Sequence, residues 1–258
     1  MGRSYALGTR VTASRPLSMT LVRDRFGRVD ELPGSGDCEA RVADWGQPAL
    51  LVSSFSYVIV GLVLLAWGLR RSDVSRRWLS LFAAGLVLTG LGSADYHGPV
   101  LGPEPLLHDG GLALALLIAL AIDLVTLGVS PRTVVAVIVG LGAVGLIAML
   151  IFPGASAAMA AVLAPGLVLV EVLIYRRGLR RLRWQFLTMI GVLAVGAAVF
   201  ALSRTGGPLC DPSSLAQGHA LWHLATAVAL GLWGVTALAH TRSPKSELEP
   251  TSEVRIRP

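Results

Sequence analysis

The chain has 258 residues, of which 53% are hydrophobic and only 15% are charged, and its formal net charge is +6. A water-soluble domain of this length needs a larger share of polar surface, so the composition excludes an ordinary globular protein. The basic excess is almost entirely arginine, placed in short clusters between apolar runs, which is typical of loops at an anionic membrane face and excludes nucleic acid as a partner.

The chain begins with a polar segment rich in arginine, proline and glycine. Its first 47 residues contain no apolar run of the kind that forms a cleavable signal peptide. We therefore predict that residues 1–34 form a mobile tail that joins no core. Residues 35–241 are predicted to form the membrane domain, and residues 242–258 a cytoplasmic tail.

Seven apolar stretches follow in chain order. A helix rises about 1.5 Å per residue, so about 20 apolar residues cross the roughly 30 Å of membrane hydrocarbon. The stretches of this length are Pro48–Leu69, Trp78–Tyr96, Leu106–Leu127, Val134–Phe152, Ser156–Tyr175, Trp184–Leu202 and His219–Ala239. The sequence therefore predicts an all-α integral membrane protein, a bundle of seven transmembrane helices.

Arginine clusters predict which way the spans run. The segments after the first, third, fifth and seventh stretches are basic, those after the second and fourth carry no basic residue, and the one after the sixth has only Arg204. Because basic loops stay in the cytoplasm, the N-terminus is predicted outside and the C-terminus inside, in a multi-pass protein of the plasma membrane. The N-terminal part has seven arginines, but only Arg28 and Arg41 lie within about 20 residues of the first span, where the rule counts most.

Four of the five histidines fall on the predicted outer side of the membrane. His97 ends the second span, His108 begins the third, and His219 and His223 open the seventh, whereas His240 lies at the other end. His219 and His223 are four residues apart, so one helix face presents both rings, and His97 offers a third nitrogen. Three histidines with a fourth position open are typical of a catalytic zinc site. The alternative for the pair is two interfacial histidines beside a tryptophan.

Two further polar residues lie on the same side. Ser93 precedes His97 by four residues and shares its helix face, although such a serine can instead bond to a carbonyl of its own helix. Asp109 opens the third span, where the helix dipole alone favours an acid. We expect His108 to be an interfacial residue or to support a ligand, and not to be a ligand itself. Asp95 points away from the face of Ser93 and His97 and is left out of the site.

These motifs together resemble those of the alkaline ceramidases. Ser93-Ala-Asp-Tyr-His97 is similar to the family's Ser-x-x-Phe/Tyr-His motif, and His108-Asp109 and His219-Ala-Leu-Trp-His223 are similar to the rest of its signature. Cys38-Glu39 resembles its N-terminal Cys-Glu element. The resemblance runs from about Asp37 to the last span, and the wider superfamily includes the adiponectin and progestin receptors and haemolysin-III-like proteins.

The resemblance implies a role for each matched residue. His97, His219 and His223 would bind Zn²⁺, Asp109 would be the acid/base, and Ser93 would assist the water and the oxyanion. Eukaryotic members also bind calcium through acids near the N-terminus, which Asp37 and Glu39 match. Gln47 stands where a further acid is expected, and the family's Asn-Thr-x-Ser-Asn is replaced by residues 50–54, so these departures weigh against calcium here.

The resemblance also bears on the two cysteines. Cys38 precedes the first span and Cys210 the seventh, so both are predicted outside, where disulfides persist. Alkaline ceramidases bridge a similarly placed pair, which implies a Cys38–Cys210 bond. The alternative is two free thiols.

The expected activity is zinc-dependent hydrolysis of a lipid amide such as a ceramide or another N-acyl lipid, with a membrane lipid as the partner and no protein partner evident. Zinc lowers the pKa of its water to about 7, which makes a nucleophile available at neutral pH. The alternative is a seven-helix receptor or binding protein with a structural zinc. A retinal protein needs a lysine within a span, but Lys245, the single lysine, lies beyond the last one. A haem or quinone protein often places its histidines at two depths of the membrane, whereas the four clustered histidines here lie at one depth.

Overall fold

The computed structural model of the protein describes residues 22–23, 29–30, 36–42, 45–70, 75–98, 104–152, 155–180 and 183–239. The predictions for His240 and for the C-terminal tail lie outside the described residues. Within the predicted N-terminal tail, two short strands, β1 (Val22–Arg23) and β2 (Val29–Asp30), form an antiparallel pair.

Seven helices account for nearly all of the described structure, and each matches one predicted span. They are α1 (Pro48–Leu69), α2 (Ser75–His97), α3 (Glu104–Thr126), α4 (Pro131–Ile151), α5 (Ala155–Arg176), α6 (Arg183–Leu202) and α7 (Gly218–Ala239). All seven are long and apolar enough to cross a membrane, so the predicted seven-helix membrane fold is confirmed. Some ends move because caps set them: α4, for example, begins at Pro131, where the Ser130 hydroxyl accepts a bond from the Thr133 backbone.

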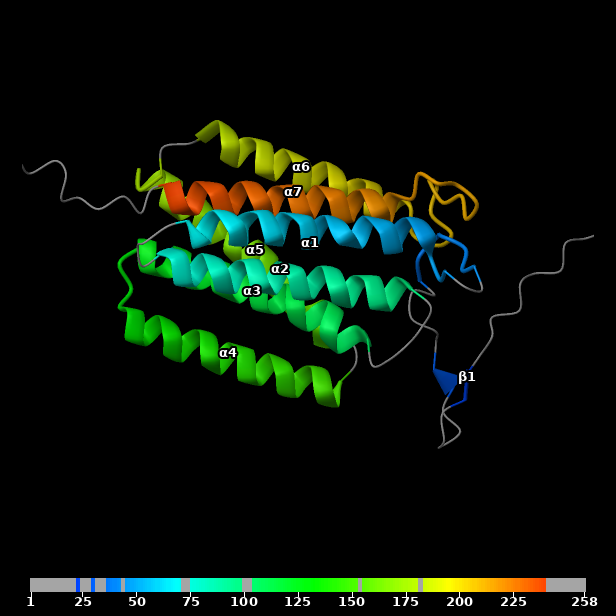
Figure 1. Ribbon diagram of the computed structural model, residues 1–258, viewed down its shortest axis with the longest axis horizontal. Coiled ribbons are helices and arrows are strands. Elements are labelled where there is room, and N and C mark those ends of the chain that lie inside the picture. Colours follow the sequence, from blue (N-terminus) through cyan, green and yellow to red (C-terminus); the bar gives the residue numbers. More distant parts are fainter. Residues whose placement is uncertain are drawn as a thin grey trace, which may run out of the picture.

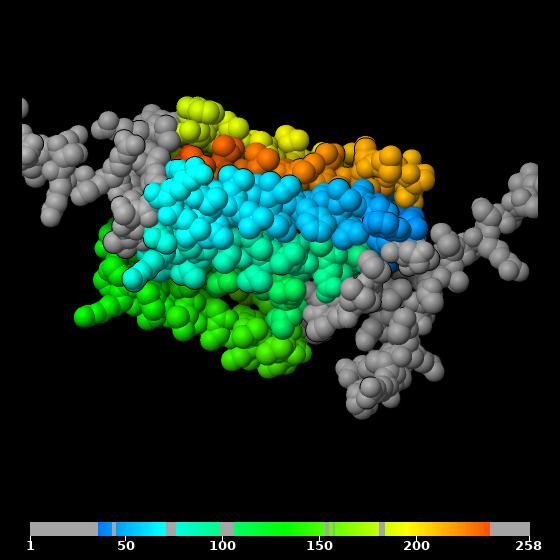
Figure 2. All heavy atoms as spheres, in the orientation of Figure 1, coloured from blue at the N-terminus to red at the C-terminus, as the bar shows by residue number. Residues whose placement is uncertain are grey.

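The helices lie side by side with their axes roughly aligned (Figure 1). Helix α1 packs against α2 and α7, and α3 packs against α2 and α5. Helices α4 and α6 lie at opposite edges, and the space-filling view shows α1 in the middle of one face, between α7 and α2 (Figure 2). Only 6% of the apolar part of α4 is buried, against 56% for α3 and α7, so α4 presents most of its surface to lipid.

A glycine lets α2 and α3 approach closely beside the predicted site. A Cβ on Gly92 would overlap the backbone of Leu107 and His108, so only glycine fits there. Small residues allow this approach in membrane bundles, where close packing holds helices together. The contact sets Ser93 and the end of α2 against the first turn of α3, where His108 and Asp109 lie.

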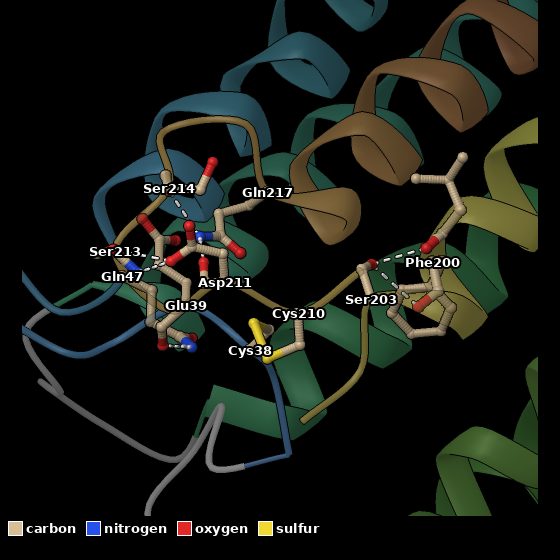
Figure 3. The surroundings of a disulfide bond; sticks show 11 residues. Cys38, Glu39, Gln47, Phe200, Ser203, Cys210, Asp211, Ser213, Ser214 and Gln217 are labelled. Atoms are coloured by element: carbon tan, nitrogen blue, oxygen red, sulfur yellow. Dashed lines mark hydrogen bonds between the residues drawn. A yellow bond between two sulfur atoms is a disulfide. The ribbon is translucent and has the colours of Figure 1, made fainter. Parts of the chain in front are cut away.

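A disulfide fastens the segment before α1 over one end of the bundle. Cys38 and Cys210 are bonded with their Cα atoms 5.5 Å apart, which confirms the predicted pairing (Figure 3). The neighbouring backbones are joined as well, since the Ala40 amide donates to the carbonyl of Pro212 at 3.1 Å. The residues that flank Cys38 are therefore held close to the start of α7.

Candidate metal centre

The end of α2 and the start of α7 bring the three predicted ligands together. The ring centroid of His97 lies 5.0 Å from that of His219 and 5.3 Å from that of His223. The His219 and His223 rings are 4.5 Å apart, as their spacing along one helix predicts. His97 and His223 are buried, with 0% and 2% of their surfaces exposed.

The orientation of the His97 ring follows from the amide of Gln47, the residue before α1. Gln47 Nε2 donates to the carbonyl of Glu39 at 3.0 Å, so the amide oxygen Oε1 faces His97 Nδ1 at 2.9 Å. An amide oxygen only accepts, so Nδ1 of His97 carries the proton and Nε2 keeps its lone pair. The backbone reinforces this contact, because the Gln47 N–H donates to the His97 carbonyl at 2.7 Å.

The two histidines of α7 are in the same state. His223 Nδ1 lies 2.9 Å from the Ser53 hydroxyl, whose own proton is donated to the Leu50 carbonyl at 3.0 Å. His219 Nδ1 lies 2.8 Å from Oδ1 of Asp37, and a carboxylate only accepts. Both rings therefore donate from Nδ1, and both keep a lone pair on Nε2.

The Nε2 nitrogens of the two buried rings have no hydrogen-bond partner among the described residues. This holds for Nε2 of His97 and Nε2 of His223. A buried polar atom left unpaired costs about 1–3 kcal/mol, so two such atoms near each other indicate an absent ligand. Metal-binding histidines show this arrangement, in which a neutral ring has a free Nε2 and a hydrogen-bond partner on Nδ1.

Two groups of three ligand atoms lie close enough to hold one metal ion. In each group the atoms lie within 4.8 Å of one another: His97, His108 and His223 form one group, and Asp37, His97 and His219 the other. His97 belongs to both groups, and neither group contains all three predicted ligands, His97, His219 and His223. The structure thus brings His108 nearer to the ligand cluster than its sequence position suggested. Imidazole-rich sites suit zinc and other late first-row metals, so the residues present fit such an ion.

Asp37 connects the metal site to the loop before α7. Its Oδ1 accepts from His219 Nδ1 and, at 2.5 Å, from Nη1 of Arg204, and its Oδ2 lies 3.9 Å from Nδ1 of His97. Only 8% of the residue is exposed. The resemblance implied a calcium-ligand position for Asp37, and in the structure this residue orients His219.

Glu39, the other acid matched to calcium binding, caps α1. Its Oε1 accepts from the Ala49 amide at 2.7 Å and its Oε2 from the Leu50 amide at 3.0 Å. These amides have no partner inside the helix, and a carboxylate favours the positive end of the helix dipole. Glu39 thereby anchors the segment that carries Asp37 and presents its carbonyl to Gln47, as Figure 3 shows for Glu39 and Gln47.

The predicted serine lies deep in the bundle, with 0% of its surface exposed. Ser93 Oγ is 2.8 Å from Ser54 Oγ, and Ser54 donates its proton to the Leu50 carbonyl at 2.7 Å. Ser93 therefore donates to Ser54, and its hydroxyl bonds to a neighbouring helix instead of its own. Its lone pairs remain available one turn before His97.

The predicted acid lies at the edge of the cluster. Asp109 Oδ1 is 2.6 Å from Nδ1 of His108, and 26% of the Asp109 side chain is exposed. His108 stands between Asp109 and the buried histidines, with its ring centroid 6.2 Å from that of His97. Asp109 is the one partly exposed carboxylate in this chain of contacts.

Sequence reasoning missed the residues that orient the rings. Gln47, Ser53 and Asp37 each contact Nδ1 of a different histidine. Weak signals were present: Gln47 directly precedes the proline that starts the first span, and Ser53 lies one turn inside it. No local pattern connects either residue to a histidine about 50 or 170 positions away.

Hydrogen bonds around the site hold its loops in place. Arg41 Nη2 donates to the Gly98 carbonyl at 2.8 Å, and partial burial lowers the pKa of its guanidinium. In the loop before α7, hydrogen bonds from the Ser213 hydroxyl and amide hold the pKa of Asp211 below its usual value. The Asp211 carbonyl accepts from Gln217 at 2.9 Å, and Gln217 directly precedes α7, two residues before His219.

The fold and site together define a multi-pass, seven-helix membrane protein with a buried cluster of histidines able to hold a metal ion. Comparison with models of known protein families finds no match to the chain, and a search of curated proteins finds no similar sequence. The resemblance to the alkaline ceramidases therefore rests on the ordered motifs of the sequence.

Proposed function

We propose that this protein is a zinc-dependent hydrolase of a membrane lipid amide, similar to the alkaline ceramidases, with His97, His219 and His223 as the zinc ligands. One observation carries the proposal. The buried Nε2 atoms of His97 and His223 have no partner within the described structure, while Nδ1 of each ring has a hydrogen-bond partner. When bound by three imidazoles, zinc supplies a Lewis acid and a water of lowered pKa at its open position.

The chain's own residues account for the remaining chemistry. Hydrolysis adds the oxygen of water to the carbonyl carbon, breaks the C–N bond and delivers a proton to the leaving amine. Asp109 takes the proton from the attacking water and passes it to the amine, which its partly exposed carboxylate allows. Ser93 accepts a hydrogen bond from the water in its present rotamer and stabilises the oxyanion after turning its proton away from Ser54.

A groove beside the site offers a path for an acyl chain. A hollow of about 550 Å³ lies between α1 and α7, and its lining is almost wholly apolar. Val52, Ile59, Ala220 and Leu224 line it, together with Ser53, whose hydroxyl contacts His223. A lipid tail in this groove would bring its amide carbonyl toward the histidines.

The arginine pattern favours the extracytoplasmic side for this end of the bundle, and we propose that the membrane is the plasma membrane. A receptor with a structural zinc would use the same three histidines, so turnover separates the two functions. Ser93 and Asp109 beside the cluster favour the hydrolase, because a structural site needs neither group.

The test is zinc content and turnover of the purified full chain. Wild type should carry one zinc and cleave at least one lipid in a panel of N-acyl lipids, and His219→Ala/His223→Ala should lose both metal and activity. Asp109→Asn should keep zinc and lose about 10²–10⁴-fold in kcat, because an amide cannot accept the proton. Full zinc retention in the double variant would refute the metal site, and zinc without turnover across the panel would favour the receptor.

A further inference from the structure

A second buried polar cluster lies at the end of the bundle opposite the histidines. Asp123 is near the end of α3, Glu171 is in the last turns of α5, Arg180 follows α5, and Trp233 is in the second half of α7. At most 2% of any of these four residues is exposed. Figure 1 shows the ends of α3, α5 and α7 on the side away from the start of α1.

The turn after α5 places Arg180 in this cluster. Gly178 has a φ of 70°, in the left-handed region where glycine is unstrained. The Gly178 amide donates to the Tyr175 carbonyl at 3.0 Å and the Leu179 amide to the Ile174 carbonyl at 3.1 Å, the paired bonds of a Schellman motif. The chain therefore reverses and returns Arg180 to the interior.

Arg180 bridges the carboxyl groups of Asp123 and Glu171, which we call the carboxyl pair. Its Nη2 donates to Asp123 Oδ1 at 2.6 Å, and its Nη1 donates to Glu171 Oε1, which also accepts from the indole N–H of Trp233. Each carboxyl thus uses one oxygen. The second oxygens, Asp123 Oδ2 and Glu171 Oε2, are buried and have no hydrogen-bond partner within the described structure.

The cluster has an excess of negative charge if both carboxyls are ionised. Arg180 is the one cation that forms salt bridges with the pair among the described residues. Burial lowers the pKa of its guanidinium, but Asp123 and Glu171 outweigh burial and raise it overall, so Arg180 stays charged. Two carboxylates and one guanidinium leave one net negative charge buried in the protein, where an uncompensated charge is strongly unfavourable.

We infer that the carboxyl pair is a proton-binding site, in which Asp123 and Glu171 share one proton at neutral pH. The two carboxyls lie side by side, because the two Nη atoms of one guanidinium group each hold an oxygen of one of them. A proton on one free oxygen, donated to the other, gives both unpartnered oxygens a bond and cancels the excess charge. Two carboxyls in such contact do not both ionise readily.

The surroundings favour a proton over a metal cation. The pair offers two free oxygens, far fewer than the six or more that hard cations prefer, and the Arg180 guanidinium repels a second cation. Among the described residues, the other titratable group that interacts electrostatically with the pair is the Tyr175 hydroxyl on α5. From α7 the cluster meets the neutral Trp233, which packs on Phe82 of α2. Nε of Arg180 also has no hydrogen-bond partner among the residues that the structure describes, and a shared proton does not supply one.

Infrared difference spectroscopy tests the site on the full chain in lipid nanodiscs, and it needs no assumption about the metal centre. Wild type at pH 7 should show a carboxylic-acid C=O band that shifts in D₂O. The band should disappear in Asp123→Asn and, independently, in Glu171→Gln, because the remaining carboxyl then pairs with Arg180 as a carboxylate. Asp211→Asn, which changes an exposed loop acid, should keep it.

Three results would overturn the inference. One is a folded wild type without the band, and a second is a band that survives in both Asp123→Asn and Glu171→Gln. The third is a band that sodium abolishes and choline does not, because the site would then bind a cation. Two separate variants keep the test open if one of them fails to fold.

Discussion

Each of the three predicted ligand histidines is held by a different chemical group on its Nδ1. Gln47 gives His97 an amide oxygen, Ser53 gives His223 a hydroxyl, and Asp37 gives His219 a carboxylate. The three groups share one property, which is that each accepts a hydrogen bond from the Nδ1–H and so leaves Nε2 as the electron-pair donor. The ring orientation is thus set before any metal arrives, which lowers the entropic cost of binding.

Gln47→Leu tests this at a single residue. The change removes the acceptor for His97 Nδ1, so the ring is free to turn or to change tautomer. Loss of such a partner typically lowers metal affinity about 10–100-fold. Competition with a chelator should show this loss, whereas Gln185→Leu on α6, which also removes a partly buried amide, should leave the affinity unchanged. Equal affinity in the two variants would contradict the role of Gln47.

At the scale of elements, the metal centre depends on how the start of α1 meets the end of α2 and the start of α7. Glu39 caps α1, Gln47 joins it to α2, and Ser53 joins it to α7. Helix α1 therefore supports the site without supplying a ligand. The same helix forms one wall of the apolar groove beside the site.

Val52→Trp on α1 should obstruct that groove. Val52 is 68% exposed, so a larger side chain fits without disturbing the core. If the groove receives an acyl chain, KM should rise about tenfold for long-chain substrates, since about 1–3 kcal/mol is at stake in one apolar subsite. Val63→Trp is the matched control, because Val63 is 62% exposed on the same helix and does not line the groove. The same KM in both variants would exclude this path.

At the scale of the whole molecule, the disulfide joins the segment before α1 to the loop before α7. Cys38 and Cys210 are 172 residues apart, and Asp37 and Glu39 flank Cys38. Cys38→Ser/Cys210→Ser should lower the free energy of unfolding by about 2–4 kcal/mol and weaken metal binding, because Asp37 is then less firmly held against His219. Thermal unfolding and chelator competition measure the two effects. Unchanged values of both would mean that the hydrogen bonds of this segment suffice without the bond.

The direction of the chain through the membrane is a further property of the whole molecule. The arginine alternation predicts that the loop after α5 is cytoplasmic and that the loop before α7 is outside. Reporter fusions after Gly178 and after Cys210 should therefore give opposite readings. The same reading from both would leave an even number of crossings between them, in conflict with the passage of α6 across the membrane.

Span positions and candidate ligands followed from local features of the chain. An apolar run of about 20 residues must form its hydrogen bonds within itself in lipid, so length and composition alone predict each helix. His219 and His223 share a face because they belong to one helix. The place of His97, at the outer end of a neighbouring span, follows from counting crossings.

Contacts between distant segments depended on packing. Nothing local pairs Ser53 with His223, Asp37 with His219, or Arg180 with Asp123, since those partners are 170, 182 and 57 residues apart. Asp123 and Glu171 each stand as an acid in an apolar stretch, which marks them as unusual but names no partner. Their meeting depends on the rotation and depth of α3 and α5, which close packing across the bundle sets and hydropathy does not encode.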